Sequence, residues 1–123
     1  MEKIFTDKAP AAIGPYSQAI KSGSFIFTSG QIPLIPATGE LCQGTIEEQT
    51  HQVCKNLSEV LKAAGSSMDK VVKTTCFLKN ISDFAAFNKV YEEYFLSKPA
   101  RSCFEVAALP KGALLEVEVT AEC

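Results

Sequence analysis

The stretch TIEEQTHQVCKNLSEVLKAAG, residues 45–65, decides the fold class because it encodes a long amphipathic helix. Thr45 and Glu48 form a capping-box pattern, in which each side chain satisfies a free N–H group at the start of a helix. Gly65 is the residue expected just beyond the last turn. The apolar residues between these signals share one helical face: Ile46, Val53, Leu57, Val60, Leu61 and Ala64. We therefore predict a helix over residues 46–64.

Strand patterns lie on both sides of this helix, where β-branched and aromatic residues alternate between turn signals. The turn at Lys21-Ser22-Gly23 joins the first two predicted strands, and Pro110-Lys111-Gly112-Ala113 joins the last two into a hairpin. The predicted strands cover residues 16–20, 24–30, 71–78, 101–109 and 114–121.

A second helix is expected after Ser82 or Asp83, either of which can cap it. Its apolar stripe is aromatic and comprises Phe84, Phe87, Tyr91, Tyr94 and Phe95. Two helices that interrupt hairpin strands predict a single α+β domain over residues 1–123, with both helices on one face of the sheet. The other face then needs a cover, for which partner subunits are the simplest source.

The length of the loop in the last predicted hairpin also predicts which residues pair across it. A four-residue loop pairs Leu109 with Leu114, and therefore Ala107 with Glu116. One face would then be polar, with Arg101, Cys103, Glu105, Glu116, Glu118 and Thr120. The other would carry Ser102, Phe104, Val106, Leu115, Val117 and Val119. Arg101 and Glu116 would lie roughly 20 Å apart along the strands, so the register differs, the sheet curls sharply, or the two residues meet across subunits.

Composition argues against several classes of protein. The net charge of −2 and pI near 5.4 do not provide the basic patch that nucleic-acid binding needs. No apolar run approaches the ~20 residues that cross a bilayer, and the first residues lack the apolar core of a signal peptide, so we expect a cytoplasmic protein. The five cysteines are widely spaced without a C-x-x-C pair, which predicts neither a disulfide framework nor a metal site.

Arg101 points most directly to a ligand. It begins a small apolar segment within residues 99–110, and its planar fork suits a carboxylate. A structural pairing with a neighbouring glutamate is the alternative. Cys103 has no histidine placed to activate it, so we interpret it as a small buried thiol. His51, the single histidine, falls on the polar side of its helix and is expected at the surface.

Five segments in this order resemble the Rid family, the reactive intermediate deaminases. They are AIGPYSQA (12–19), TSGQIP (28–33), VVKTT (71–75), PARSC (99–103) and LEVE (115–118). The resemblance implies a homotrimer with a chorismate-mutase-like fold, a sheet of about six strands and ligand clefts between subunits. It also implies hydrolysis of 2-imino acids, such as 2-iminobutanoate and 2-iminopropanoate, to 2-oxo acids and ammonia.

The resemblance further assigns roles by position. Arg101 binds the substrate carboxylate with the Cys103 N–H group as a further donor, and Glu116 orients the water. The residues that line the cleft are Tyr16, Ser29 and Asn88, with Phe87 a further candidate to reach it. These residues could also have purely structural roles, as strand residues, a core aromatic or a solvated carboxylate. Only three residues, 96–98, separate the second helix from Pro99, which is shorter than in many relatives.

The chemistry agrees with this set of residues. An imine is already an electrophile, so its hydrolysis requires a held substrate, a positioned water and proton transfer, with no cofactor or metal. Two other functions stay open. One is a sensor that binds 2-oxo acids without turnover. The other is a ribonuclease, translation inhibitor or holdase chaperone, although the acidic pI disfavours RNA binding.

Overall fold

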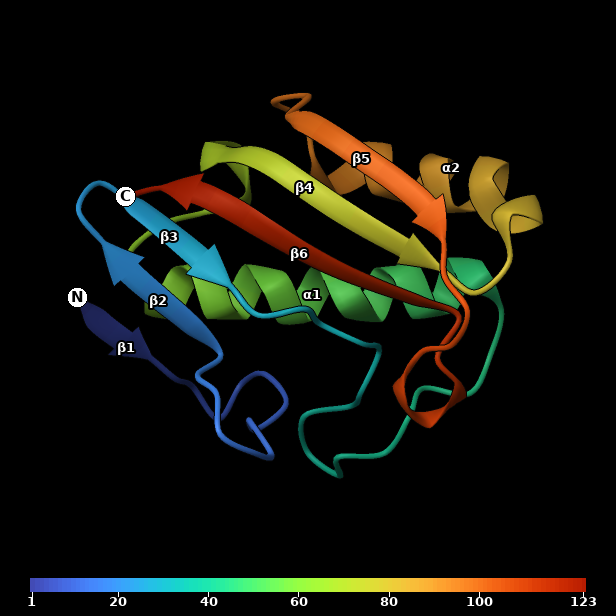
Figure 1. Cartoon of the computed structure of the whole chain (residues 1–123), viewed down its shortest axis with the longest axis horizontal. Helices are drawn as coiled ribbons and strands as arrows, with labels where there is room; N and C mark the ends of the chain where they lie inside the picture. The colour runs from blue at the N-terminus through green and yellow to red at the C-terminus, as the bar shows by residue number, and fades with distance from the viewer.

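The computed structural model describes residues 1–123 and contains one six-stranded sheet with two long helices (Figure 1), as the predicted α+β class requires. The strands are β1 (Glu2–Ile4), β2 (Ala19–Ser22), β3 (Phe25–Thr28), β4 (Val71–Leu78), β5 (Ala100–Glu105) and β6 (Leu115–Glu122). The helices are α1 (Ile46–Ala63) and α2 (Phe84–Tyr94), with short 3-10 turns at Met68–Lys70, Ile81–Asp83 and Pro110–Gly112. The order across the sheet is β1-β2-β3-β6-β4-β5.

Helix α1 confirms the prediction at both ends. The Thr45 hydroxyl accepts a hydrogen bond from the Glu48 N–H at 3.2 Å, and the Glu48 side chain accepts one from the Thr45 N–H. The chain leaves the helix through Gly65, whose φ of +82° is costly for any residue with a Cβ. The predicted apolar face of α1 is buried against the sheet, which places the core between them.

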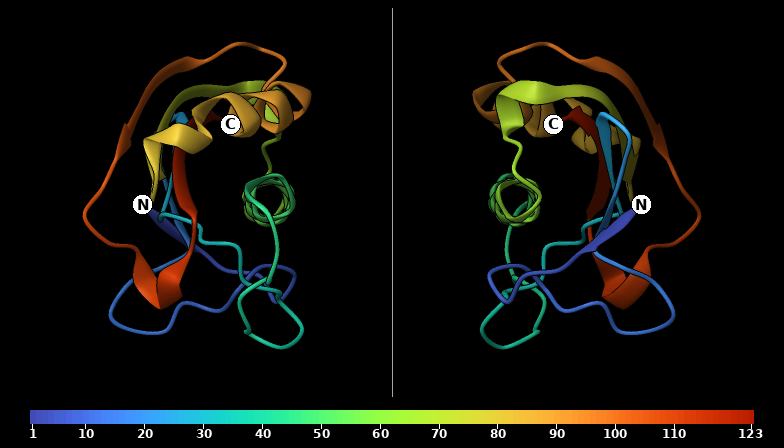
Figure 2. Two further views of the ribbon diagram at one scale, coloured as in Figure 1. Left: turned by 90° about the vertical axis from the view of Figure 1, so that its right-hand side faces the viewer. Right: turned by 90° about the vertical axis from the view of Figure 1, so that its left-hand side faces the viewer.

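Helix α2 begins at Phe84 after the turn Ile81–Asp83, and Asp83 makes no side-chain capping hydrogen bond. The predicted aromatic stripe divides along the helix. Phe87, Tyr91 and Phe95 are buried, whereas Phe84 stays partly exposed near the first turn. Figure 2 shows the sheet close to edge-on, with both helices on the same side of it. Neither helix has the length and apolarity to cross a membrane.

The first predicted hairpin is present, but its strands are shorter and shifted. Strands β2 and β3 pair antiparallel, with Ser22 opposite Phe25, and Gly23 turns the chain at φ +59°. The N-terminal strand β1 was not expected and pairs antiparallel with β2. Strand β4 has the predicted bounds.

The predicted hairpin between the last two strands is wrong. Strand β4 lies between them, pairing parallel with β5 and antiparallel with β6. The reason is that β4, α2 and β5 form a strand–helix–strand crossover, which returns the chain parallel to β4 at the sheet edge. The connection over residues 106–114 then passes around the end of β4. There the Val106 N–H donates to the Leu78 carbonyl, and the Lys79 N–H donates to the Leu114 carbonyl, both at 2.9 Å.

The face of the sheet away from the helices carries exposed aromatic side chains. Phe27 on β3 and Phe104 on β5 are 47% and 44% exposed, and Phe104 meets Phe77 edge-on with ring centroids 5.3 Å apart. Nothing within the single chain covers this face, as the position of both helices predicted. Burial of large apolar groups is a main source of association free energy, and exposed apolar patches of this kind are common at interaction surfaces.

Candidate functional site

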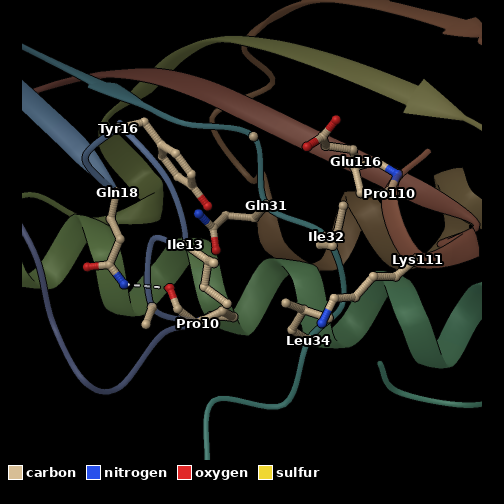
Figure 3. A pocket seen from close by; sticks show the side chains of 12 residues that line it. Pro10, Ile13, Tyr16, Gln18, Gln31, Ile32, Leu34, Pro110, Lys111 and Glu116 are labelled. Atoms are coloured by element: carbon tan, nitrogen blue, oxygen red, sulfur yellow. Dashed lines mark hydrogen bonds between the residues drawn. The ribbon is translucent and has the colours of Figure 1, made fainter. Parts of the chain in front are cut away.

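Glu116 borders a cavity of about 490 Å³ at the end of the sheet where three loops meet (Figure 3). The loops are residues 5–18, 29–45 and 106–114, which extend from the same side of the molecule (Figure 1). Apolar side chains such as Ile13, Ile32 and Leu34 form part of the wall, and Tyr16 and Lys111 border it as polar groups. A cavity of this size, with apolar walls and several polar groups, is typical of a site for a small molecule.

The Glu116 carboxylate is packed against the backbone of Gly30. A Cβ atom added to Gly30 would lie 2.6 Å from Oε2 of Glu116, so the carboxylate occupies the space that any other residue would fill. Glu116 takes no part in an ion pair, because the chain contains a single one, between Lys62 and Glu59. Burial raises the pKa of Glu116 above its usual value, and the neighbouring Glu118 carboxylate raises it further.

Ser29 and Tyr16 lie beside this cavity in different ways. The Ser29 hydroxyl donates to the Ser17 carbonyl at 2.6 Å, which ties β3 to the loop before β2. Tyr16 contributes its side chain to the wall and is half exposed. The structure therefore brings two of the predicted site residues, Glu116 and Tyr16, to one cavity, and Ser29 stands next to Gly30 of its wall without lining it.

Three buried carboxamides fix the loops of the wall, and sequence reasoning missed all of them. Gln18 donates to the Pro10 carbonyl at 2.7 Å, and Asn56 donates to the Leu34 carbonyl at 2.9 Å. Gln49 accepts from the Leu114 N–H at 2.9 Å, two residues before Glu116. The available signal was that Gln49 and Asn56 stand seven residues apart on the apolar face of α1, where a buried polar group needs a specific partner.

Arg101 lies elsewhere, on the edge strand β5 beneath helix α2. Its Nη1 donates to Oδ1 of Asn88 at 2.7 Å, and its Cζ lies 4.8 Å from the centroid of the Tyr91 ring. The alternative interpretation from the sequence, a structural pairing with a glutamate, does not occur, since Arg101 is in no ion pair. A guanidinium offers five donors, so donors remain for a carboxylate ligand.

Cys103 and Phe87 flank this second group. Cys103 pairs in register with Cys76 on β4 and is partly buried, and burial raises the pKa of its thiol above the usual value. Phe87 is fully buried and packs against Tyr91 with centroids 5.5 Å apart, so in the single chain it belongs to the core. His51 is partly buried, with its Nδ1 2.8 Å from the Tyr94 hydroxyl, rather than free at the surface.

The two groups lie on opposite faces of the sheet. Arg101 pairs with Thr74 and through it with Val119, which is buried under the helices. Glu116 pairs with Phe77, which in turn pairs with the exposed Phe104. Directly paired residues share a face, so the single polar face predicted for Arg101 and Glu116 is wrong. The error follows from the inserted strand β4, which changes the register and the face of each residue.

Comparison with known proteins gives a consistent family. Residues 6–123 match the model of the family described as endoribonuclease L-PSP. A mouse 2-iminobutanoate/2-iminopropanoate deaminase is 50% identical over 96% of this chain and 88% of its own length. The chloroplastic Reactive Intermediate Deaminase A of Arabidopsis thaliana is also 50% identical, over 98% of this chain and 65% of its own.

Solved structures agree with this assignment. RidA from an Antarctic Psychrobacter superposes with a TM-score of 0.95 at 43% identity, covering all of both chains. TdcF of E. coli with bound serine superposes with a TM-score of 0.95 at 41% identity, covering all of this chain and 99% of the TdcF chain. The resemblance seen in the sequence motifs is therefore confirmed. The chain belongs to the endoribonuclease L-PSP family, which includes the reactive intermediate deaminases.

Proposed function

We propose that this protein hydrolyses 2-imino acids, such as 2-iminobutanoate and 2-iminopropanoate, to 2-oxo acids and ammonia. The family relationship supports the reaction class, because two relatives at 50% identity carry deaminase names, and one of them is named for 2-iminobutanoate and 2-iminopropanoate. The observation that carries the proposal is a pair of charged groups, one suited to bind the substrate carboxylate and one suited to transfer protons. Arg101 is a cation in no ion pair, and Glu116 is a carboxylate in no ion pair beside a cavity.

The substrate would be held through its carboxylate. A bidentate contact with Arg101 fixes the plane of the carboxylate, and the imine carbon is bonded directly to that group. The aromatic and amide contacts of Arg101 leave its positive charge uncompensated. A small anionic substrate is therefore recognised by charge and shape together.

Glu116 would manage the protons. Its carboxylate accepts a proton as water attacks the carbon of the protonated imine, and a neutral tetrahedral carbinolamine forms. Glu116 then returns that proton to the nitrogen. The C–N bond breaks as the C=O bond forms, the Glu116 carboxylate takes the hydroxyl proton and passes it to the departing ammonia, and the 2-oxo acid remains. A pKa raised by burial suits both halves of this exchange, because a group that both takes and gives a proton works best near the operating pH.

The complete site would form between copies of the chain. Arg101 and Glu116 lie on opposite faces of one sheet, two strands and three residues apart in register, or roughly 14 Å between Cα atoms. The exposed aromatic side chains on the uncovered face supply an apolar contact surface. We propose a homotrimer in which Arg101 of one subunit faces Glu116 of another.

The test is a coupled assay in which threonine dehydratase releases 2-iminobutanoate and its loss is followed. The wild-type protein should accelerate that loss, and Arg101→Ala should lower kcat/KM about 100-fold or more, as expected for loss of a charged bidentate contact. Arg101→Lys, which retains the charge without the fork, should fall between the two. Each variant must keep the circular dichroism of the wild type and a mass of three 13.3-kDa chains. Unchanged turnover in a folded Arg101→Ala would contradict the proposal.

Binding without turnover is the second candidate function. The structure of E. coli TdcF with bound serine shows that a relative at 41% identity holds an amino acid. Calorimetric binding of 2-oxobutanoate, combined with no acceleration of imine loss, would favour this role over the deaminase.

A further inference from the structure

The contacts of Arg101 come from one face of helix α2. Besides Asn88, the guanidinium lies near two aromatic rings, with Cζ 4.8 Å from the Tyr91 centroid and 5.3 Å from the Phe84 centroid. Phe84, Asn88 and Tyr91 stand at positions i, i+4 and i+7, so the helix presents them along a single stripe. Tyr91 is the buried member of this set, and the mechanism above gives it no role.

Tyr91 is itself locked in place. Its hydroxyl lies 2.8 Å from Oγ1 of Thr74, and both residues are buried. Thr74 is also the residue of β4 that pairs directly with Arg101. Three contacts therefore link these residues in a closed set. Arg101 pairs with Thr74 in the sheet, Thr74 is hydrogen-bonded to Tyr91, and the Tyr91 ring lies against the Arg101 guanidinium. The ring cannot swing away without breaking a buried hydrogen bond, which is costly.

The groups that restrain Arg101 are all uncharged. Burial raises the pKa of the Tyr91 phenol, which keeps it neutral well above neutral pH. A carboxylate in the place of the ring would hold the arginine equally well, but it would compete with the substrate carboxylate for the same donors. An aromatic face attracts the cation without accepting hydrogen bonds from the N–H groups in the plane of the guanidinium, so those not bonded to Asn88 stay free for a carboxylate.

We propose that Tyr91, locked by Thr74, is a positioning residue that holds the Arg101 guanidinium in the orientation that receives the substrate carboxylate. The inference rests on the proposed role of Arg101 in the deaminase. Ordering a long side chain at the moment of binding costs affinity, and a preformed orientation avoids that cost. Tyr91 therefore acts on substrate binding, whereas the chemical step at the imine carbon depends on Glu116.

Four single variants distinguish the effect of the Tyr91 ring, the effect of its hydroxyl contact with Thr74, and the effect of damaged packing. Tyr91→Leu removes the ring, and Tyr91→Phe and Thr74→Val break the hydroxyl contact from either side. The control is Phe95→Leu, because Phe95 stacks on Tyr91 with centroids 4.3 Å apart but is not one of the two rings near Arg101. It damages the same aromatic cluster without touching the guanidinium.

The expected result is a loss of binding with little loss of turnover. The Kd for 2-oxobutanoate and the KM for the imine should rise about tenfold in Tyr91→Leu and about threefold in each hydroxyl variant, with kcat within about twofold of the wild type. The double variant Tyr91→Phe and Thr74→Val should bind the ligand no more weakly than either single variant, because both substitutions remove the same hydroxyl contact. Phe95→Leu should lower the melting temperature and leave Kd and KM unchanged.

A measurement without ligand distinguishes this inference from the proposed function. Nitrogen-15 relaxation of the Arg101 Nε should show a rigid guanidinium in the wild type and in Phe95→Leu, and a mobile one in Tyr91→Leu. The inference is overturned by a mobile Arg101 in the wild type, by wild-type affinity in a folded Tyr91→Leu, or by an equal loss of affinity in Phe95→Leu. If the wild type neither binds 2-oxobutanoate nor hydrolyses the imine, the proposed function fails, and the relaxation data still decide whether Tyr91 holds the guanidinium.

Discussion

The surroundings of Arg101 and of Glu116 are built on different principles. Arg101 is held by side chains of one helix, through a hydrogen bond to Asn88 and the rings of Tyr91 and Phe84. Glu116 lies instead in a space left by the absent side chain of Gly30, at the border of a cavity. The proposed binding group is restrained by contacts, while the proposed reacting group is placed by the shape of the backbone around it.

The position of the two groups on the sheet adds to this difference. Arg101 is on the face that packs under the helices, and Glu116 is on the face that carries the exposed aromatic residues. The two halves of the proposed site therefore face away from each other within one chain. This arrangement fits the proposal that a second copy completes the site, with binding at one half and proton transfer at the other.

The sharpest test of that division is Glu116→Gln. The amide retains the size of the side chain but cannot accept a proton, so kcat for imine hydrolysis should fall about 100-fold, within the usual contribution of a general acid–base group. KM should change little, because the Arg101 half-site is intact. Steady-state kinetics in the coupled assay measure both. A variant with normal kcat and a raised KM would show that Glu116 binds substrate and would remove the proposed division.

A smaller effect is expected when the space beside Glu116 is filled. Gly30 has no positive φ, so alanine is compatible with its backbone, but the new Cβ would displace the Glu116 carboxylate. We expect Gly30→Ala to lower kcat about tenfold, because small misplacements of a reacting group are costly.

The control for this prediction is the same change in a Glu116→Ala background. There the new Cβ has no carboxylate to displace, and Gly30→Ala should have no further effect on the residual rate. An equal loss of rate in both backgrounds would show that Gly30 acts on something other than Glu116.

The smallest expected effect is a shift of the pH profile in Glu118→Gln. Glu116 works in its ionised form as the base, so the rate falls as the pH drops through its raised pKa. The Glu118 charge is one cause of that raised pKa, and its removal lowers the pKa. The acidic limb of kcat/KM should therefore move to lower pH, with little change at neutral pH. Glu122→Gln, at the far end of the same strand, is the matched control and should leave the limb in place.

The predicted fold was correct where local signals determine the structure. The capping box at Thr45, the helical face that follows and the alternation over Val71–Leu78 all concern residues within one element. The pairing of β5 was not predictable in the same way, because a turn signal at Pro110-Lys111-Gly112-Ala113 is compatible with a hairpin and with a longer connection. The strand–helix–strand order was the signal for a parallel crossover, and it outweighs the local turn.

The sequence motifs name candidate site residues but not their arrangement. The motifs single out Arg101 and Glu116, yet the face of the sheet on which each residue lies depends on the inserted strand β4. The contacts of Asn88 and Tyr91 with Arg101 depend on the crossing of α2 over β5, which no local pattern encodes. From the sequence alone, Tyr91 is therefore predicted to be one more core aromatic residue, although its ring lies against the Arg101 guanidinium.

Subunit mixing tests the central claim most directly. Arg101→Ala and Glu116→Gln chains, each with little activity alone, are denatured together in equal amounts and refolded. If each site takes Arg101 from one chain and Glu116 from another, random assembly restores about a quarter of the sites, since each contributor is intact in half of the cases. The account predicts activity near that fraction of the wild type. A mixture no more active than the sum of the two separate preparations would contradict it and place both residues of each site in one chain.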